Sequence, residues 1–319
     1  MPRIATIAAL GLAALTSTSA AQATEGLEWS WEGASHTYYL RGKIGLPKVV
    51  WMRAFNNAEV RVFQIRAELV TTCAPTTQLG KKAWELSCKI DDLSIQAVPL
   101  PADKGRLDPI LLEWDERLTG KSLEIQFTRD GRVRNVSLDS LKRRNRRDGE
   151  NIELMRQLFT RMLSPLDLRM PKKATDDGLG VWTQKNPLIL GFFSSAGSLG
   201  TINLEHKITK TEGAKIVVHS EGKGTSASAG SQTAVAGQEQ ISDWYAMEMV
   251  SDATFDTKHG LMLTRSVAAS GAPTASSMMA DGTAGLRYVQ LYAAEYVQPD
   301  GPRPTLPESK EIGDAFAKD

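Results

Sequence analysis

The sequence predicts a mainly β (α+β) protein, in which one amphipathic helix accompanies an antiparallel, curved sheet or half-barrel. A sheet arrangement with two related β halves also fits the sequence. Three observations lead to this class. Several segments alternate apolar and polar residues with the period of a half-buried strand. Turn-forming residues separate these segments. A single long segment repeats its apolar residues at helical spacing. The chain is 41% hydrophobic and 24% charged, which indicates an ordinary globular protein.

Residues 1–23 have the three parts of a cleavable secretory signal peptide. Arg3 supplies an early positive charge, Ile4–Leu15 is an apolar run, and Ala21-Gln22-Ala23 forms a small-residue cleavage site. The apolar run is shorter than the roughly 20 residues that span a bilayer. We therefore expect a periplasmic or secreted protein, cleaved after Ala23, with no transmembrane segment in the mature chain.

Residues 24–140 are expected to form an N-terminal antiparallel β part, in which Ser35–Ile44 is the first strand. The start of this part is rich in aromatic side chains. An apolar ring with a polar tip suits the mouth of a ligand site, and it suits the edge of a core equally well. The candidate ligand-binding residues of this segment are Trp29, Trp31, Tyr38 and Tyr39.

Residues 58–98 are predicted to form a hairpin, with residues 74–80 as its turn. Both arms alternate apolar and polar residues, and Cys73 and Cys88 each continue an apolar face. A register that places the two cysteines opposite each other puts both apolar sets on one side of the sheet. Two cysteines this close in an exported protein are expected to form a disulfide.

Leu123–Leu138 is predicted to be a second hairpin. Asp130-Gly131 favours a type I′ turn. Folding the chain about this turn pairs Ile125 with Val136, and Leu123 with Leu138, so that four apolar residues share one face.

Residues 141–170 are expected to contain a basic linker and the amphipathic helix, Asp148–Leu163. Met155, Phe159 and Met162 recur at helical spacing, which indicates a stripe that faces the core or an apolar ligand. The preceding basic residues suit either a solvated linker or an anionic partner. They are Arg143, Arg144, Arg146 and Arg147.

Residues 171–298 are expected to form a C-terminal β meander, and residues 299–319 a disordered tail rich in proline and charge. Within the meander, residues 171–199 are interpreted as irregular and residues 222–237 and 270–284 as small-residue loops. The predicted strands are Thr201–Thr209, Lys215–Ser220, Ile241–Phe255, Leu261–Ala268 and Leu286–Val297.

The sequence contains no pattern that indicates catalysis, a metal or a cofactor. No two of the four histidines lie within five residues of each other, so the helical zinc motif is absent. No strained serine turn and no phosphate-binding loop occurs. The 38 basic and 37 acidic residues balance, which argues against a nucleic-acid partner. We therefore expect that the protein is not an enzyme and has no metal site and no cofactor.

The order of elements over roughly residues 58–297 is strands, a hairpin with Asp130-Gly131, one amphipathic helix and further strands. This order resembles the half-barrel proteins of bacterial envelopes, the lipoprotein carrier and LppX-like group. The resemblance implies a curved sheet that wraps an apolar helix and holds lipid. This chain departs from many of those proteins because it has no lipobox, and the resemblance assigns no residue to a role.

Three functions follow from these observations. The first is an exported soluble binding or carrier protein for an apolar or amphipathic ligand, such as a lipid, in the bacterial envelope. The second is a structural or interaction protein that contacts an envelope protein and has no enzymatic activity. The third is a hydrolase whose site residues are scattered along the sequence.

Overall fold

The computed structural model describes most of the chain that follows the predicted signal peptide. Residues 1–23 lie outside the described residues, so export stays a prediction. The described residues are 27–53, 59–80, 83–138, 140–141, 146–171, 180–188, 200–227, 244–273 and 288–313.

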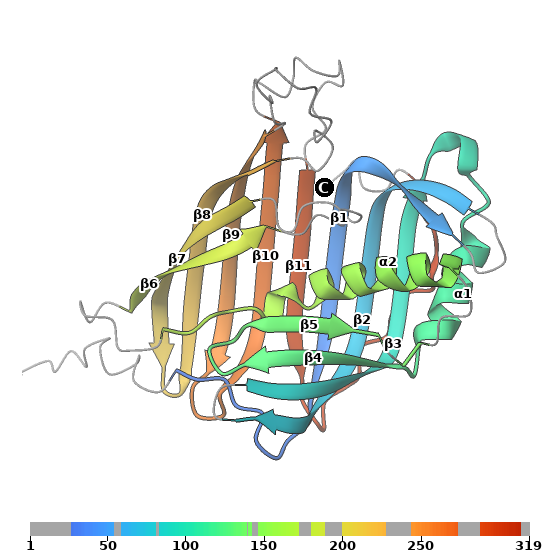
Figure 1. The fold of residues 1–319 in the computed structure, drawn as a ribbon. Helices are drawn as coiled ribbons and strands as arrows, with labels where there is room; N and C mark the ends of the chain where they lie inside the picture. The colour runs from blue at the N-terminus through green and yellow to red at the C-terminus, as the bar shows by residue number, and fades with distance from the viewer. Residues whose placement is uncertain are drawn as a thin grey trace, which may run out of the picture.

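A single twelve-stranded sheet dominates the fold, which confirms the mainly β class (Figure 1). Neighbouring strands are antiparallel and follow the order β5-β4-β3-β2-β1-β11-β10-β9-β8-β7-β6, and β12 pairs in parallel with β3. The strands are β1 (His36–Arg53), β2 (Glu59–Leu79), β3 (Ala83–Pro99), β4 (Ser122–Thr128), β5 (Val133–Ser137), β6 (Val181–Leu188), β7 (Gly200–Glu212), β8 (Lys215–Ala227), β9 (Trp244–Asp256), β10 (Leu261–Pro273), β11 (Tyr288–Val297) and β12 (Lys310–Glu311).

The sheet consists of two meanders, β1–β5 and β6–β11, that are joined side by side. β1 pairs with β11 over Thr37–Ile44, so the hydrogen-bonded ladder is continuous across the join. The predicted N-terminal β part and C-terminal meander therefore belong to one sheet, and the first predicted strand is confirmed within β1.

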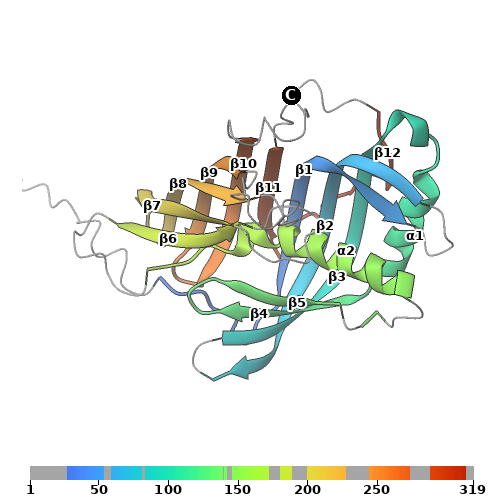
Figure 2. The same cartoon turned by 45° about the horizontal axis from the view of Figure 1, so that its top comes forward.

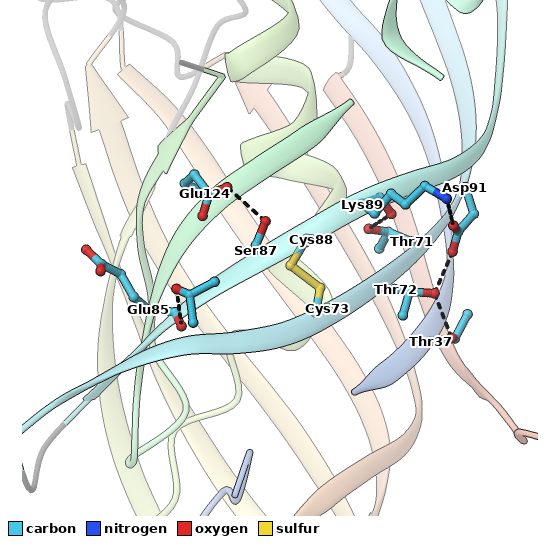
Figure 3. Close-up of a disulfide and its surroundings, with 11 residues drawn as sticks. Thr37, Thr71, Thr72, Cys73, Glu85, Ser87, Cys88, Lys89, Asp91 and Glu124 are labelled. Atoms are coloured by element: carbon cyan, nitrogen blue, oxygen red, sulfur yellow. Dashed lines mark hydrogen bonds and ion pairs between the residues drawn. A yellow bond between two sulfur atoms is a disulfide. The ribbon is translucent and has the colours of Figure 1, made fainter. Parts of the chain in front are cut away.

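The first hairpin has the predicted register. Cys73 lies opposite Cys88 and is bonded to it (Figure 3). The apolar residues on either side are buried. The predicted turn at residues 74–80 is wrong, because β2 continues to Leu79 past an irregularity between Pro75 and Thr77. Cross-strand pairing of this stretch with the start of β3 overrides its turn-like composition.

The second hairpin exists, but its turn differs from the prediction. Glu124 pairs with Ser137 in the predicted register, and an irregularity then shifts the ladder so that Phe127 pairs with Val133. The Thr128 amide donates to the carbonyl of Arg132 at 2.9 Å. The loop therefore has three residues and ends at Gly131, whose φ is +89°, as in a hairpin with a glycine bulge.

The predicted amphipathic helix is confirmed as α2 (Arg146–Met162), which crosses one face of the sheet in front of β11, β1 and β2 (Figure 1). Its stripe of Met155, Phe159 and Met162 is buried. Gly42 of β1 makes the approach possible, because a Cβ atom there would lie 2.5 Å from Met162 Sδ. Pro165 falls in the short helix η3 (Ser164–Leu166) that follows.

A second α-helix, α1 (Asp108–Leu118), was not predicted, although Pro109 at its start and buried Ile110, Leu111, Trp114 and Leu118 have helical spacing. A short helix, η2 (Pro101–Asp103), precedes it.

The expectation of a disordered tail is wrong for residues 299–313. Ser309 Oγ accepts from the Ile95 amide at 3.0 Å and donates to Asp115 at 2.9 Å, which fixes this segment beside β3 and α1 (Figure 2).

The strands β6–β9, which we call the wing, extend further than predicted. β6 occupies part of the stretch 171–199 that was expected to be irregular. β8 reaches Ala227 and β10 reaches Pro273, so the predicted loops 222–237 and 270–284 are wrong at their first residues. Backbone pairing with the neighbouring strands specifies these ends, although their small side chains give no strand pattern.

Among the described residues, no helix is both long and apolar enough to cross a membrane.

Candidate functional site

The two faces of the sheet differ in chemistry. We call the face that α2 crosses the inner face. Along β7, Ile202, Leu204, His206 and Ile208 are buried on this face, and the residues between them are exposed on the outer face. Because successive side chains of a strand point to opposite faces, strand register alone assigns every residue of the wing to one face.

The predicted aromatic residues close one end of the inner face. Trp29 lies between Phe127 of the first meander and Phe255 of the second, with ring centroids 4.8 and 5.3 Å away. Its Nε1 donates to the carbonyl of Leu168 at 3.0 Å. Trp31 packs against Phe127 and, with Tyr38, is completely withdrawn from solvent. Trp29, Trp31 and Tyr38 therefore belong to the core that joins the meanders.

Tyr39 points to the outer face, away from the other three candidates. Its hydroxyl donates to Glu68, and Arg41 lies over its ring at 5.1 Å. Burial and the bond to this carboxylate raise the pKa of Tyr39 to about 12. The structure thus separates Tyr39 from Trp29, Trp31 and Tyr38, which sequence reasoning had grouped into one mouth.

The stripe of α2 also belongs to the continuous core. Met155, Phe159 and Met162 pack with the apolar residues of β1–β5. Of the predicted anionic-partner residues, Arg143 and Arg144 lie outside the described residues. Arg146 and Arg147 begin α2, and their side chains also lie outside the description.

A separate apolar surface lies on the inner face of the wing and β10. Its four residues are each at most 8% exposed, yet they do not belong to the core cluster. They are Ile202, Leu204, Met247 and Ala269, and we call them the wing surface. Among the described elements, α2 packs mainly on β1 and β5 and η3 on β10 and β11, rather than on β7–β9.

The wing surface has one buried polar group without a partner. Gln290 of β11 lies directly opposite Ala269 and is 8% exposed. Its Nε2 has no hydrogen-bond partner among the residues that the structure describes. A buried donor of this kind is rare in folded proteins and calls for an acceptor such as a water or a ligand.

A polar band borders the wing surface and consists of Gln184, His206, Ser220, Ser251 and Arg265. His206 Nδ1 lies 2.7 Å from Ser220 Oγ, and its Nε2 lies 3.0 Å from Gln184 Oε1. The Gln184 oxygen can only accept, so Nε2 carries the proton and Ser220 donates to Nδ1. Burial lowers the pKa of His206 to about 3, so the imidazole is neutral.

Arg265 anchors the other end of this band. Its guanidinium donates to Ser251 Oγ at 2.8 Å and to the carbonyl of Pro165 at 3.0 Å. Burial lowers the pKa of Arg265 to about 10 and raises that of the neighbouring Asp167 to about 6. The band therefore ties the chain that follows α2 to the inner face of β10.

The histidines in the described part of the chain are either buried or paired with an aspartate. His206 and Ser220 are completely buried. His219 points to the outer face, where it lies 2.8 Å from Asp252, and His259 lies 2.8 Å from Asp256 in a turn. Within the described residues, no group of three or more potential metal ligands comes together.

Sequence reasoning missed the wing surface and the polar band. The alternation of Ile202 and Leu204 was visible, and so was that of Met247 and Met249 in the predicted strand Ile241–Phe255. Whether these residues join the core depends on where α2 lies, and the alternation of residues along a strand gives no information about the position of the helix.

Comparison with known proteins assigns no family. No family model and no curated protein matches the chain. A solved structure described as "lipid–protein interactions in lipovitellin" is similar over 88% of this chain, with a TM-score of 0.47 and 10% identity. The match covers 27% of that chain. Similarity at this level assigns neither a family nor a ligand, so the resemblance to envelope carriers stays a prediction.

Proposed function

We propose that this protein is an exported binding or carrier protein for an apolar or amphipathic ligand of the bacterial envelope, and that the ligand lies against the wing surface. One observation carries the proposal: apolar side chains of β7, β9 and β10 are buried on the inner face, beyond the strands on which α2 packs and at the margin of the core. Ligand sites are typically lined by such apolar residues together with a few placed polar groups.

The polar groups beside the wing surface favour an amphipathic ligand over a pure hydrocarbon. Gln290 offers a buried Nε2 donor without a partner, and the band from His206 to Arg265 lies next to the apolar residues. A ligand with one hydrogen-bond acceptor would satisfy Gln290 while its chain inserts beside Leu204 and Met247, which are already withdrawn from water without it. The Cys73–Cys88 bond agrees with an oxidising compartment outside the cytoplasm.

The test is native mass spectrometry of the exported protein, purified without detergent and then extracted with organic solvent. We expect extra mass that extracts as lipid, or its recovery when a fluorescent long-chain acyl probe is added. Met247→Gln should reduce probe binding at least tenfold. Leu112→Gln, at an exposed site on α1, should leave binding unchanged. A wild-type protein that neither retains extra mass nor binds the probe would contradict the proposal.

We also propose that the protein catalyses no reaction. His206 is held neutral, and both of its ring nitrogens are engaged by Ser220 and Gln184, which suits a structural role. Hydrolysis of acyl-ester probes that is lost in Ser220→Ala would overturn this proposal and favour the hydrolase interpretation.

An interaction role in the envelope is the second candidate function. Of the five large apolar side chains exposed in the described part of the chain, three lie on the outer face of β9 and β11. They are Val250, Val289 and Leu291. Single exposed apolar residues are common, whereas a group on the two strands that flank β10 indicates a contact surface.

A further inference from the structure

One row of outer-face side chains crosses seven neighbouring strands, from β7 to β2, in direct register. Each residue of this row is the Cα partner of the next, and together they form two acids, three apolar residues and two bases. We call this set the charge row: Glu205, Glu221, Val250, Ala268, Leu291, Lys43 and Arg66.

Within one molecule this order places like charges side by side, and Arg66 also pairs with Glu68 of its own strand at 2.6 Å. Glu205 lies directly opposite Glu221, and Lys43 directly opposite Arg66. Like charges at opposed positions of an antiparallel pair destabilise the sheet. Between them, Val250 is 45% exposed and Leu291 41% exposed, so the middle of the row leaves apolar surface in water.

The row is complementary to itself, with Ala268 of β10 as its midpoint. A two-fold axis that runs along β10, between two sheets packed face to face, reverses the row. Under this operation Glu221 faces Lys43 of a second copy and Glu205 faces its Arg66. Val250 then faces Leu291, and Ala268 faces Ala268.

We propose that the outer face of β7–β11, β1 and β2 is the interface of a symmetric homodimer of this chain. The arrangement places each like-charged pair against an oppositely charged pair and removes the exposed apolar residues from water. It is an isologous contact, in which the same patch is used by both copies. The interface does not depend on a ligand at the wing surface, which lies on the other face of the sheet.

The width of the row matches what a stable dimer needs. Seven strands at a spacing of about 4.8 Å extend over about 29 Å. A specific interface buries about 800 Å² on each partner, which corresponds to a patch of about that width.

The experiment is sedimentation velocity of the full exported chain from low to high micromolar concentration. We expect a monomer–dimer equilibrium. Glu221→Lys and Lys43→Glu should each weaken the dimer at least tenfold, because each places like charges across the axis. The double variant E221K/K43E restores opposite charges and should dimerise like the wild type. An equimolar mixture of the two single variants should form the heterodimer.

Two controls separate dimerisation from folding. Glu116→Lys on α1 and Lys121→Glu before β4 change the same charges at exposed positions outside the seven strands of the charge row and should leave the dimer intact. Glu221→Lys also removes the repulsion from Glu205, so the monomer should unfold at the wild-type temperature or above. A wild-type chain that stays monomeric throughout would overturn the proposal. So would single variants that dimerise normally, or a double variant that does not recover.

Discussion

The disulfide half of the sheet, β1–β5, and the wing, β6–β9, are built from similar strands but are covered differently. Every residue from Leu93 to Pro99 of β3 is buried, because α1 and the tail segment around Ser309 add to the cover on this strand. In the wing, burial alternates strictly, as in Ile202–Ile208 of β7. A strand segment that is packed on both faces, such as Leu93–Pro99, contributes more to stability, and strands that are packed on one face leave the other face free for contacts.

The join between the two regions should be the most sensitive part of the fold. Trp29→Ala removes a ring that contacts Phe127 of one meander and Phe255 of the other, and we expect a loss of about 3–5 kcal/mol in the free energy of unfolding. Urea denaturation measures this loss. Leu112→Ala, at an exposed site, is the control. A loss below about 1 kcal/mol, the range of surface substitutions, would show that Trp29 does not couple the meanders.

Removing the disulfide should weaken one region and spare the other. Because Cys73 and Cys88 close a loop of 15 residues, the variant Cys73→Ser/Cys88→Ser should lose about 3 kcal/mol in the chain-entropy model. Hydrogen exchange should then speed up in β2 and β3 but not in β7 and β8. Equal acceleration in all four strands would contradict the distinction between the two regions. The wild type with and without reductant provides the matched comparison.

A leucine-to-alanine substitution should lower the free energy of unfolding by different amounts in the two regions. Leu69→Ala lies in the continuous core and should cost about 4–5 kcal/mol, whereas Leu204→Ala of the wing surface should cost about 2 kcal/mol, the two ends of the range for buried leucines. Binding of the acyl probe should follow the opposite order, with the larger loss in Leu204→Ala. Equal stability losses at the two positions would place Leu204 in the core.

The titrations of Asp167 and His206 change the free energy of unfolding in opposite directions as the pH falls, so they should give the smallest effect. Asp167 has its pKa raised from 3.8 to about 6, so the folded state binds more protons and stability rises as the pH falls from about 6 towards 4. His206 has its pKa lowered from 6.5 to about 3, so stability falls as the pH drops below 6.5. Relative to the wild type, Asp167→Asn should lose more stability between pH 6 and pH 4, and His206→Gln should lose less. Unfolding temperatures measured across this range test both signs, and identical pH profiles for all three proteins would contradict both shifts.

The sequence by itself determined the period-2 strands, the amphipathic helix and the cysteine pairing. These features are local, because the alternation of Leu69, Thr71 and Cys73 specifies one face of a strand, and only one register aligns it with Leu86, Cys88 and Ile90. Single-sequence patterns failed where pairing partners decide the structure: β6, the ends of β8 and β10, and β12. The three-residue turn requires glycine at position 131, because a Cβ atom there would collide with Trp29 and Leu168.

The candidate site was decided by the tertiary structure alone. Strand pattern shows that Leu204 and Met247 are apolar, but whether they join the core depends on where α2 crosses the sheet. The same limit explains Tyr38 and Tyr39, which are adjacent in sequence and point to opposite faces. The charge row requires the register of six strand pairs, each set by contacts between residues far apart in the chain, so no local pattern could reveal it.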